Sequence, residues 1–157
     1  VKNGEDMEAR EGMAWADTCG GLAIANAGVT LPHGVGMMIS GHCPQIMHGE
    51  SLALTYPSFL QFTCPAAEKK FADVGRIFQP SLRDAEDSRA ARECCREIEN
   101  LMKDIGMWLN FRQFDVTYDI IRKIADRGHE LPDYQANPRI ADIEEIYREL
   151  KEGYDRV

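Results

Sequence analysis

Three of the four histidines in the chain lie close together in a stretch that contains no Asp, Glu, Lys or Arg. They are His33, His42 and His48, and the charge-free stretch runs from Thr18 to Gly49. An exposed histidine cluster normally lies among charged residues. Imidazoles in an uncharged stretch therefore indicate a buried pocket that is used chemically, with neutral rings available as ligands or proton carriers.

The spacing of two of these histidines is compatible with a metal site. His33 lies near the start of a predicted helix, where the positive end of the helix dipole favours the neutral ring. His48 follows after that helix and a loop, a separation that permits both rings to reach one point. Imidazole suits iron or zinc, whereas magnesium and calcium prefer carboxylates. In the alternative interpretation each histidine is an ordinary core or loop residue, and two ligands alone do not complete a catalytic site.

Other residues near the histidines have open or structural roles. Glu50 could ligate a metal directly, cap the following helix or hold an imidazole in place. Cys43 has no neighbouring cation in the sequence that would favour a thiolate, so we expect a structural role. Gly34, Gly36 and Gly41 form neither GxGxxG nor GxxxxGK, and we expect them to allow close packing of helices or close approach of a ligand.

Composition narrows the class of protein. The chain has 157 residues and a net charge of −8, which predicts one domain over residues 1–157 and no nucleic-acid partner. The charge-free stretch contains seven glycines and two prolines, so we do not expect it to span a membrane. Five cysteines without CxxC spacing predict reduced thiols and a cytoplasmic location.

Hydrophobic periodicity predicts an all-α fold, a multi-helix bundle without strands. Caps, prolines and glycines place the expected helices at residues 6–27, 30–43, 50–57, 66–78, 87–105, 117–127 and 140–151.

Three expectations concern how these helices pack. The first helix is small and apolar on all sides in its second half, so we expect it to be central in the domain. Pro57 is expected to kink or end the third helix. The fourth helix is expected to turn one apolar side inward, made of Phe71, Val74, Ile77 and Phe78.

A longer pattern links the histidines to a known family. Asn26-Ala27-Gly28 is followed by His33 and then by His48-Gly49, which opens a hydrophobic helix. Over Asn26 to Thr63 the chain resembles the C-terminal helical domain of the iron-containing alcohol dehydrogenases. Asp6 to Asp17 is similar to the preceding helix of that family, and Asn137 to Arg139 looks like the turn before its last helix.

The resemblance implies a metal-dependent oxidoreductase. In this family an iron, sometimes zinc, is held by an aspartate and three histidines, and the last two histidines match His33 and His48. The other two ligands and the NAD- or NADP-binding domain belong upstream of Val1. The resemblance thus implies the C-terminal part of a two-domain, homo-oligomeric enzyme that interconverts alcohols and aldehydes or ketones by hydride transfer. We expect the 157-residue chain alone to be inactive.

Two features differ from the family pattern. Met37 stands where the family often has a histidine near the nicotinamide, which makes Met37 a cofactor-contact candidate. The spacing from His33 to His48 is one residue longer than the common pattern, which makes His42 the candidate to replace the missing histidine in proton transfer. Two alternatives remain. Dehydroquinate synthases share the architecture and carry a motif similar to His48-Gly49-Glu50, and a non-catalytic helical interaction module would contain the same histidines incidentally.

Overall fold

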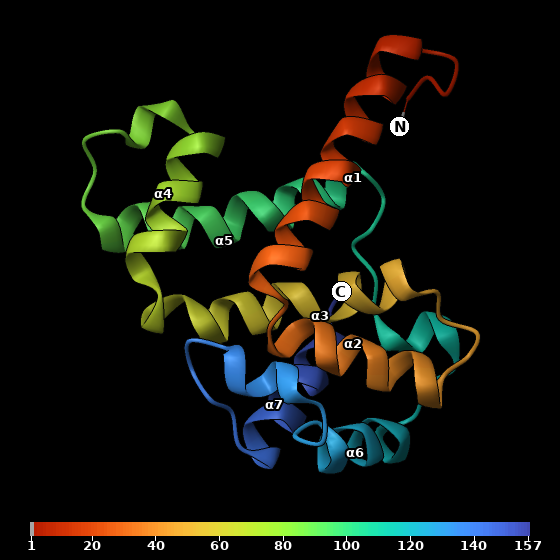
Figure 1. Cartoon of the computed structure of the whole chain (residues 1–157). Helices are drawn as coiled ribbons and strands as arrows, with labels where there is room; N and C mark the ends of the chain where they lie inside the picture. Colours follow the sequence, from red (N-terminus) through yellow and green to blue (C-terminus); the bar gives the residue numbers. More distant parts are fainter. Residues whose placement is uncertain (1) are drawn as a thin grey trace.

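The computed structural model describes residues 2–157, and within them every regular element is helical (Figure 1). The all-α expectation is therefore confirmed. The α-helices are α1 (Met7–Ala27), α2 (Leu31–His42), α3 (His48–Thr63), α4 (Glu68–Phe78), α5 (Asp87–Asp104), α6 (Tyr118–Arg127) and α7 (Ile143–Asp155). Short 3-10 turns are η1 (Cys64–Ala66), η2 (Pro80–Leu82), η3 (Phe111–Phe114) and η4 (Pro132–Ala136).

Two hydrophobic clusters hold these helices together. The larger cluster joins α2, α3, α6 and α7, and side chains such as Val35, Phe59 and Ile124 are fully buried in it. The smaller cluster joins the end of α3 to the α4–α5 pair through small residues such as Ala72 and Ala90. In Figure 1 the α4–α5 pair accordingly lies to one side of the group formed by α2, α3, α6 and α7.

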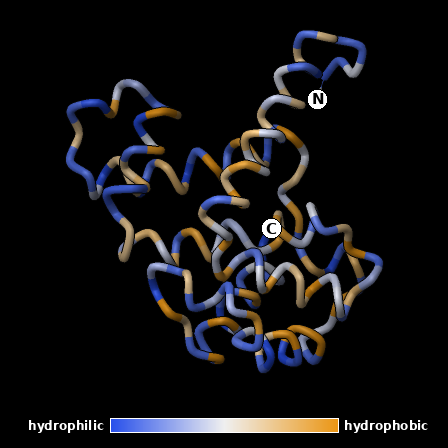
Figure 2. The backbone as a smooth tube through the Cα atoms, viewed as in Figure 1, coloured by the Kyte–Doolittle hydropathy of each residue, from blue (hydrophilic) through white to orange (hydrophobic). Residues whose placement is uncertain are grey.

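Helix α1 extends away from both clusters (Figure 1). It begins where Asp6 accepts the backbone N–H of Ala9, and it ends at Gly28, whose φ of 74° favours glycine. No residue of α1 is buried, and Trp15 and Leu22 are among its exposed side chains. Hydrophobic and hydrophilic residues alternate along the tube of this helix (Figure 2). The expected central position is wrong for the described residues. A helix that is apolar on every side has no hydrophobic stripe to indicate where, or whether, neighbours cover it.

Helix α3 continues through Pro57 instead of ending there. A proline has no N–H, so the carbonyl of Ala53, four residues earlier, loses its helical partner. The guanidinium of Arg156, which follows α7, donates to that oxygen at 3.3 Å and to the Leu54 oxygen at 3.3 Å. A donor from the far end of the chain thus replaces the missing bond.

Helix α4 packs through a different side from the one expected. Val74, Ile77 and Phe78 are exposed, whereas Ala72 and Gly75 are buried. A Cβ at Gly75 would lie 2.3 Å from the carbonyl oxygen of residue 90 in α5, so the two helices approach through small residues. Close backbone approach, and not burial of the largest side chains, determines which side of α4 faces α5.

The remaining helix ends mostly follow the expected signals. Thr117 caps α6 by accepting the N–H of Ile120, but Thr30 occupies the cap position of α2 without a side-chain cap bond. Helix α7 begins later than predicted because Asp142 and Glu145 form a capping box beyond the Asn-Pro turn. Among residues 2–157, no single helix is long and apolar enough to cross a membrane; α1 and α2 together would be, but they are bent by 106°.

Candidate metal centre

His33 and His48 lie together although fourteen residues separate them in the sequence. His33 is in the first turn of α2 and His48 is the first residue of α3. Their ring centroids are 5.1 Å apart with an interplanar angle of 79°, an edge-to-face arrangement. Two imidazoles at this separation fit neighbouring positions around one metal ion, since zinc or iron ligates ring nitrogens at about 2.0–2.1 Å.

Gly36 allows the two helices that carry these histidines to pack closely. A Cβ at this position would lie 3.0 Å from Leu52 Cδ2 and 3.1 Å from Ser51 Oγ, both on α3. The buried hydroxyl of Thr55 donates to the carbonyl of Pro32 at 3.3 Å, which ties α3 to the first turn of α2. The expectation that the glycines of this stretch allow close packing is confirmed at Gly36.

A residue that the sequence did not indicate contacts the histidine pair. The carboxylate oxygen Oδ2 of Asp133 lies 3.3 Å from Nδ1 of His33, and these side chains are 22% and 23% exposed. Asp133 belongs to η4, in a segment that the sequence presents only as a loop. Because the two residues are one hundred positions apart, no local spacing could have linked them.

Glu50 acts as a helix cap. Its Oε2 accepts the backbone N–H of Met47 at 2.8 Å, so the capping alternative is confirmed. The acid therefore satisfies one of the otherwise unpaired amides at the start of α3, next to His48.

The structure places His42 and Met37 on the same helix as His33. His42 follows nine residues later, about 14 Å along the axis at the rise of an α-helix, and its Nδ1 lies 2.9 Å from the Met38 oxygen. The structure does not bring His42 to the histidine pair, and its proton-transfer role stays a prediction. Met37 follows His33 by one turn on the same side and is 46% exposed.

The pair is more accessible than the charge-free stretch implied. His48 is exposed and His33 is partly buried, so the expected buried pocket is wrong for His48. An uncharged stretch records the absence of charged side chains within itself, but not which other segments cover it. Within residues 2–157, no group of three or more His, Cys, Asp and Glu side chains has the geometry of a metal site.

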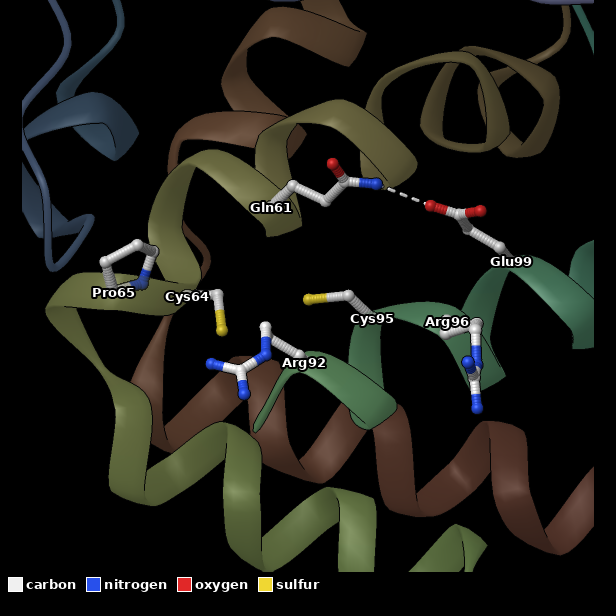
Figure 3. Close-up of a pocket in the computed structure, with 7 residues that line it drawn as sticks. All are labelled: Gln61, Cys64, Pro65, Arg92, Cys95, Arg96 and Glu99. Carbon is white, nitrogen blue, oxygen red and sulfur yellow. Dashed lines mark hydrogen bonds between the residues drawn. The ribbon is translucent and has the colours of Figure 1, made fainter. Parts of the chain in front are cut away.

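A separate hollow of about 430 Å³ lies between the end of α3, η1 and α5 (Figure 3). Cys64 and Cys95 point into it, and Gln61 donates to Glu99 across one side at 2.5 Å. Burial raises the pKa of both thiols, that of Cys95 to about 12. Protonated thiols are poor nucleophiles, so these cysteines act here as packing residues. Burial likewise raises the pKa of Cys43, consistent with its expected structural role.

Comparison with known proteins identifies the family. A sequence model described as "Fe-containing alcohol dehydrogenase family, C-terminal" matches residues 1–154. The chain belongs to the Fe-containing alcohol dehydrogenase family. The family expected from His33, His48 and the motifs around them is thereby confirmed.

Individual members of the Fe-containing alcohol dehydrogenase family agree with this assignment. The chain is 28% identical over 151 residues to the NAD-dependent methanol dehydrogenase of Bacillus methanolicus, covering 96% of this chain and 39% of the relative. It is 25% identical over 154 residues to the 1,3-propanediol dehydrogenase of Klebsiella pneumoniae, covering 98% and 40%. The chain thus spans about two fifths of these relatives' lengths.

A solved structure supports the fold. The crystal structure of a 1,3-propanediol oxidoreductase superposes with a TM-score of 0.90 at 24% identity, covering 96% of this chain and 39% of that one. At this identity the likeness concerns the fold alone, and it confirms the all-α architecture of the family's C-terminal region.

Proposed function

We propose that this chain contributes half of the metal site of an NAD(P)-linked alcohol dehydrogenase that interconverts alcohols and aldehydes or ketones. The observation that carries the proposal is the approach of His33 to His48, 5.1 Å between ring centroids, in a chain whose family is named for iron and alcohol oxidation. Relatives are named as an NAD-dependent methanol dehydrogenase, a 1,3-propanediol dehydrogenase and a long-chain-alcohol dehydrogenase, which supports alcohols as the substrate class.

The two candidate ligands, His33 and His48, fit iron or zinc. Both candidate ligands are imidazoles, the donor that these ions accept readily, and they occupy neighbouring helix starts. His33 has one ring nitrogen beside Asp133 and the other left to bind a metal. When bound, the metal supplies a Lewis acid beside the reacting carbon–oxygen bond.

The chain's own residues then have distinct tasks. His33 and His48 hold the metal from α2 and α3, and the close packing at Gly36 keeps the two helices in register. Met37, one turn after His33, offers an exposed apolar side chain to the nicotinamide of NAD or NADP. The proposal includes action in the cytoplasm, supported by five free cysteines, and a homo-oligomeric enzyme.

Metal titration of the 157-residue chain tests the ligand assignment. Zn²⁺ or Co²⁺ is titrated into the protein and into His33→Ala and His48→Ala, with His129→Ala as the matched control because His129 is exposed and lies elsewhere. Even outer-shell partners are worth about 10- to 100-fold in metal affinity, so removing a ligand should weaken binding by at least about 10-fold. Equal affinities for all four proteins would overturn the assignment.

Turnover provides the second test. We propose that the 157-residue chain, supplied with Fe²⁺ or Zn²⁺, NAD or NADP and small alcohols, reduces no cofactor beyond the level of the His33→Ala, His48→Ala double variant. The support is that two imidazoles fall short of the three or four protein ligands of a catalytic centre. Turnover well above that of the double variant would show that the chain needs no further ligands.

A further inference from the structure

The contact between Asp133 and His33 is a built feature of the fold. The two side chains come from elements one hundred residues apart, and each is roughly three-quarters buried. Helix α2 also has space for Asp133, because the residue that faces the carboxylate is a glycine and has no side chain. A Cβ at Gly34, the residue after His33, would lie 3.2 Å from Asp133 Cβ and 3.5 Å from its Oδ2.

The segment that carries Asp133 is anchored on both sides. Tyr134 packs against the main hydrophobic cluster beside α2. Asn137, which is 4% exposed, donates from its amide to Thr63 Oγ1 at 3.0 Å and to the Arg139 carbonyl at 2.8 Å. These contacts hold the segment against the main cluster and the end of α3, so its position is supported by packing and not by the pair alone.

The chemistry of the pair depends on which ring nitrogen carries the proton. A carboxylate at Nδ1 accepts the N–H of that nitrogen, so the neutral ring holds its proton there. The lone pair of Nε2 is then available, and rotation of the ring is restricted. A metal-ligating histidine commonly donates its other N–H to a carboxylate, which fixes the tautomer and increases the basicity of the ligand nitrogen.

We propose that Asp133 is a positioning residue that fixes the tautomer and orientation of His33 for metal binding through Nε2, and that Gly34 is required because it admits Asp133. This inference rests on the proposed function, since it assigns a partner to one of the two proposed ligands. It adds a role for Asp133, which the sequence did not mark as part of the site, and gives Gly34 a specific one.

The tautomer of His33 is measured first, without any metal. Long-range proton–nitrogen NMR on the 157-residue chain at about pH 8.5, where imidazoles are neutral, reports the proton on each ring nitrogen. The His33 signals are assigned by their loss in His33→Ala. We expect His33 to be mainly the Nδ1–H form in the parent chain and to shift toward the Nε2–H form in Asp133→Ala, which leaves no acceptor at that position. An unchanged tautomer ratio in Asp133→Ala would overturn the inference.

Metal affinity is measured next, by titrating Zn²⁺ alone. Asp133→Asn and Gly34→Ala should each weaken binding by about 10- to 100-fold, the usual effect of losing an outer-shell partner. Glu130→Gln is the matched control. It removes a nearby carboxylate that accepts a hydrogen bond from Arg127 and contacts no histidine ring in this way. Gly34→Ala also separates positioning from folding, since alanine raises helix propensity by about 1 kcal/mol and should not unravel α2.

The two proposals fail in different ways. If His33→Ala and His48→Ala weaken Zn²⁺ binding but Asp133→Asn stays within about twofold of the parent chain, the positioning role is wrong and the ligand assignment stands. If neither histidine variant changes Zn²⁺ binding, the ligand assignment is wrong, and the metal-free tautomer measurement still decides whether Asp133 orients His33.

Discussion

Arg156 should be among the most important residues for stability, because it completes the interrupted hydrogen bonding of α3. Its guanidinium donates to the carbonyls of Ala53 and Leu54 at 3.3 Å each and to that of Leu109 at 3.0 Å. The ring of Trp108 lies under the same group, 4.6 Å from its central carbon. Burial lowers the pKa of Arg156 from its usual value, which shows that the folded chain accepts a desolvation cost to place the charge there.

The size of the expected stability loss follows from the carbonyl oxygens that would have no donor after truncation of Arg156. A buried acceptor left without a partner costs about 1–3 kcal/mol, and the Ala53 oxygen has no helical donor because Pro57 supplies none. With three carbonyls affected and partial access to water, Arg156→Ala should lower the free energy of unfolding by about 3 kcal/mol. For a chain of this size about 2–4 °C of Tm accompanies each kcal/mol, so Tm should fall by about 6–12 °C.

Thermal and urea unfolding followed by circular dichroism measure this effect. Arg148→Ala is the matched control, an exposed arginine of the preceding helix α7, and should change Tm by no more than about 2 °C. Arg156→Lys keeps the charge but not the planar, forked guanidinium, so its Tm should fall by an amount between those of the two alanine variants. If Arg156→Ala is no less stable than Arg148→Ala, the guanidinium does not compensate for the proline, and the explanation of the unbroken α3 is wrong.

Three further outcomes are expected. Burial, and then Glu152, raise the pKa of Glu149 from 4.5 to about 7 in the folded chain. As the pH rises between these two values, the carboxyl ionises in the unfolded chain but stays protonated in the folded one. The free energy of unfolding should therefore fall with rising pH by up to about 3 kcal/mol. Urea unfolding at several pH values measures this fall, which Glu149→Gln should abolish. Gly75→Ala should lower the free energy of unfolding by about 1–3 kcal/mol despite its better helix propensity, because the new Cβ would lie 2.3 Å from the α5 backbone. Gly12→Ala, in exposed α1, is the control and should not destabilise the chain. Equal stability of the two variants would contradict the close contact between α4 and α5. Iodoacetamide should label the exposed Cys19 first, as peptide mapping would show, because burial raises the pKa of the other thiols, those of Cys43, Cys64, Cys94 and Cys95.

The helices that the sequence predicted best are those whose two faces differ most. In α5 the buried positions Ala91, Cys94 and Met102 alternate with charged residues at helical spacing, and Gly106 ends the helix with a φ of 76°. Helix α6 has a threonine cap and a buried pair at Ile121 and Ile124. In both, one local pattern contains the start, the end and most of the inward face. The exceptions are Leu101 and Ile105, which follow the apolar spacing of α5 but are exposed.

The failures share a different cause, which is that a distant segment decides the outcome. A proline rule applied to α3 predicts a kink or an end at Pro57, but it cannot include a guanidinium from the last residues of the chain. The composition of α1 is compatible with neighbours on several sides, yet nothing within the helix states whether such neighbours exist. In α4 the largest apolar side chains are the wrong guide, because backbone contact with α5 favours Gly75.

The candidate site combines both situations. His33 and His48 could be paired from the family resemblance, and the packing at Gly36 explains how their two helices bring the rings to 5.1 Å. Asp133 could not be found in this way, since its only signal is a glycine beside His33 that is also compatible with ordinary helix packing. The carboxylate becomes visible only when η4 folds back on α2, and it changes what the pair can do. Two imidazoles with free rotation have several possible donor arrangements, whereas a His33 whose Nδ1–H donates a hydrogen bond to Asp133 has one.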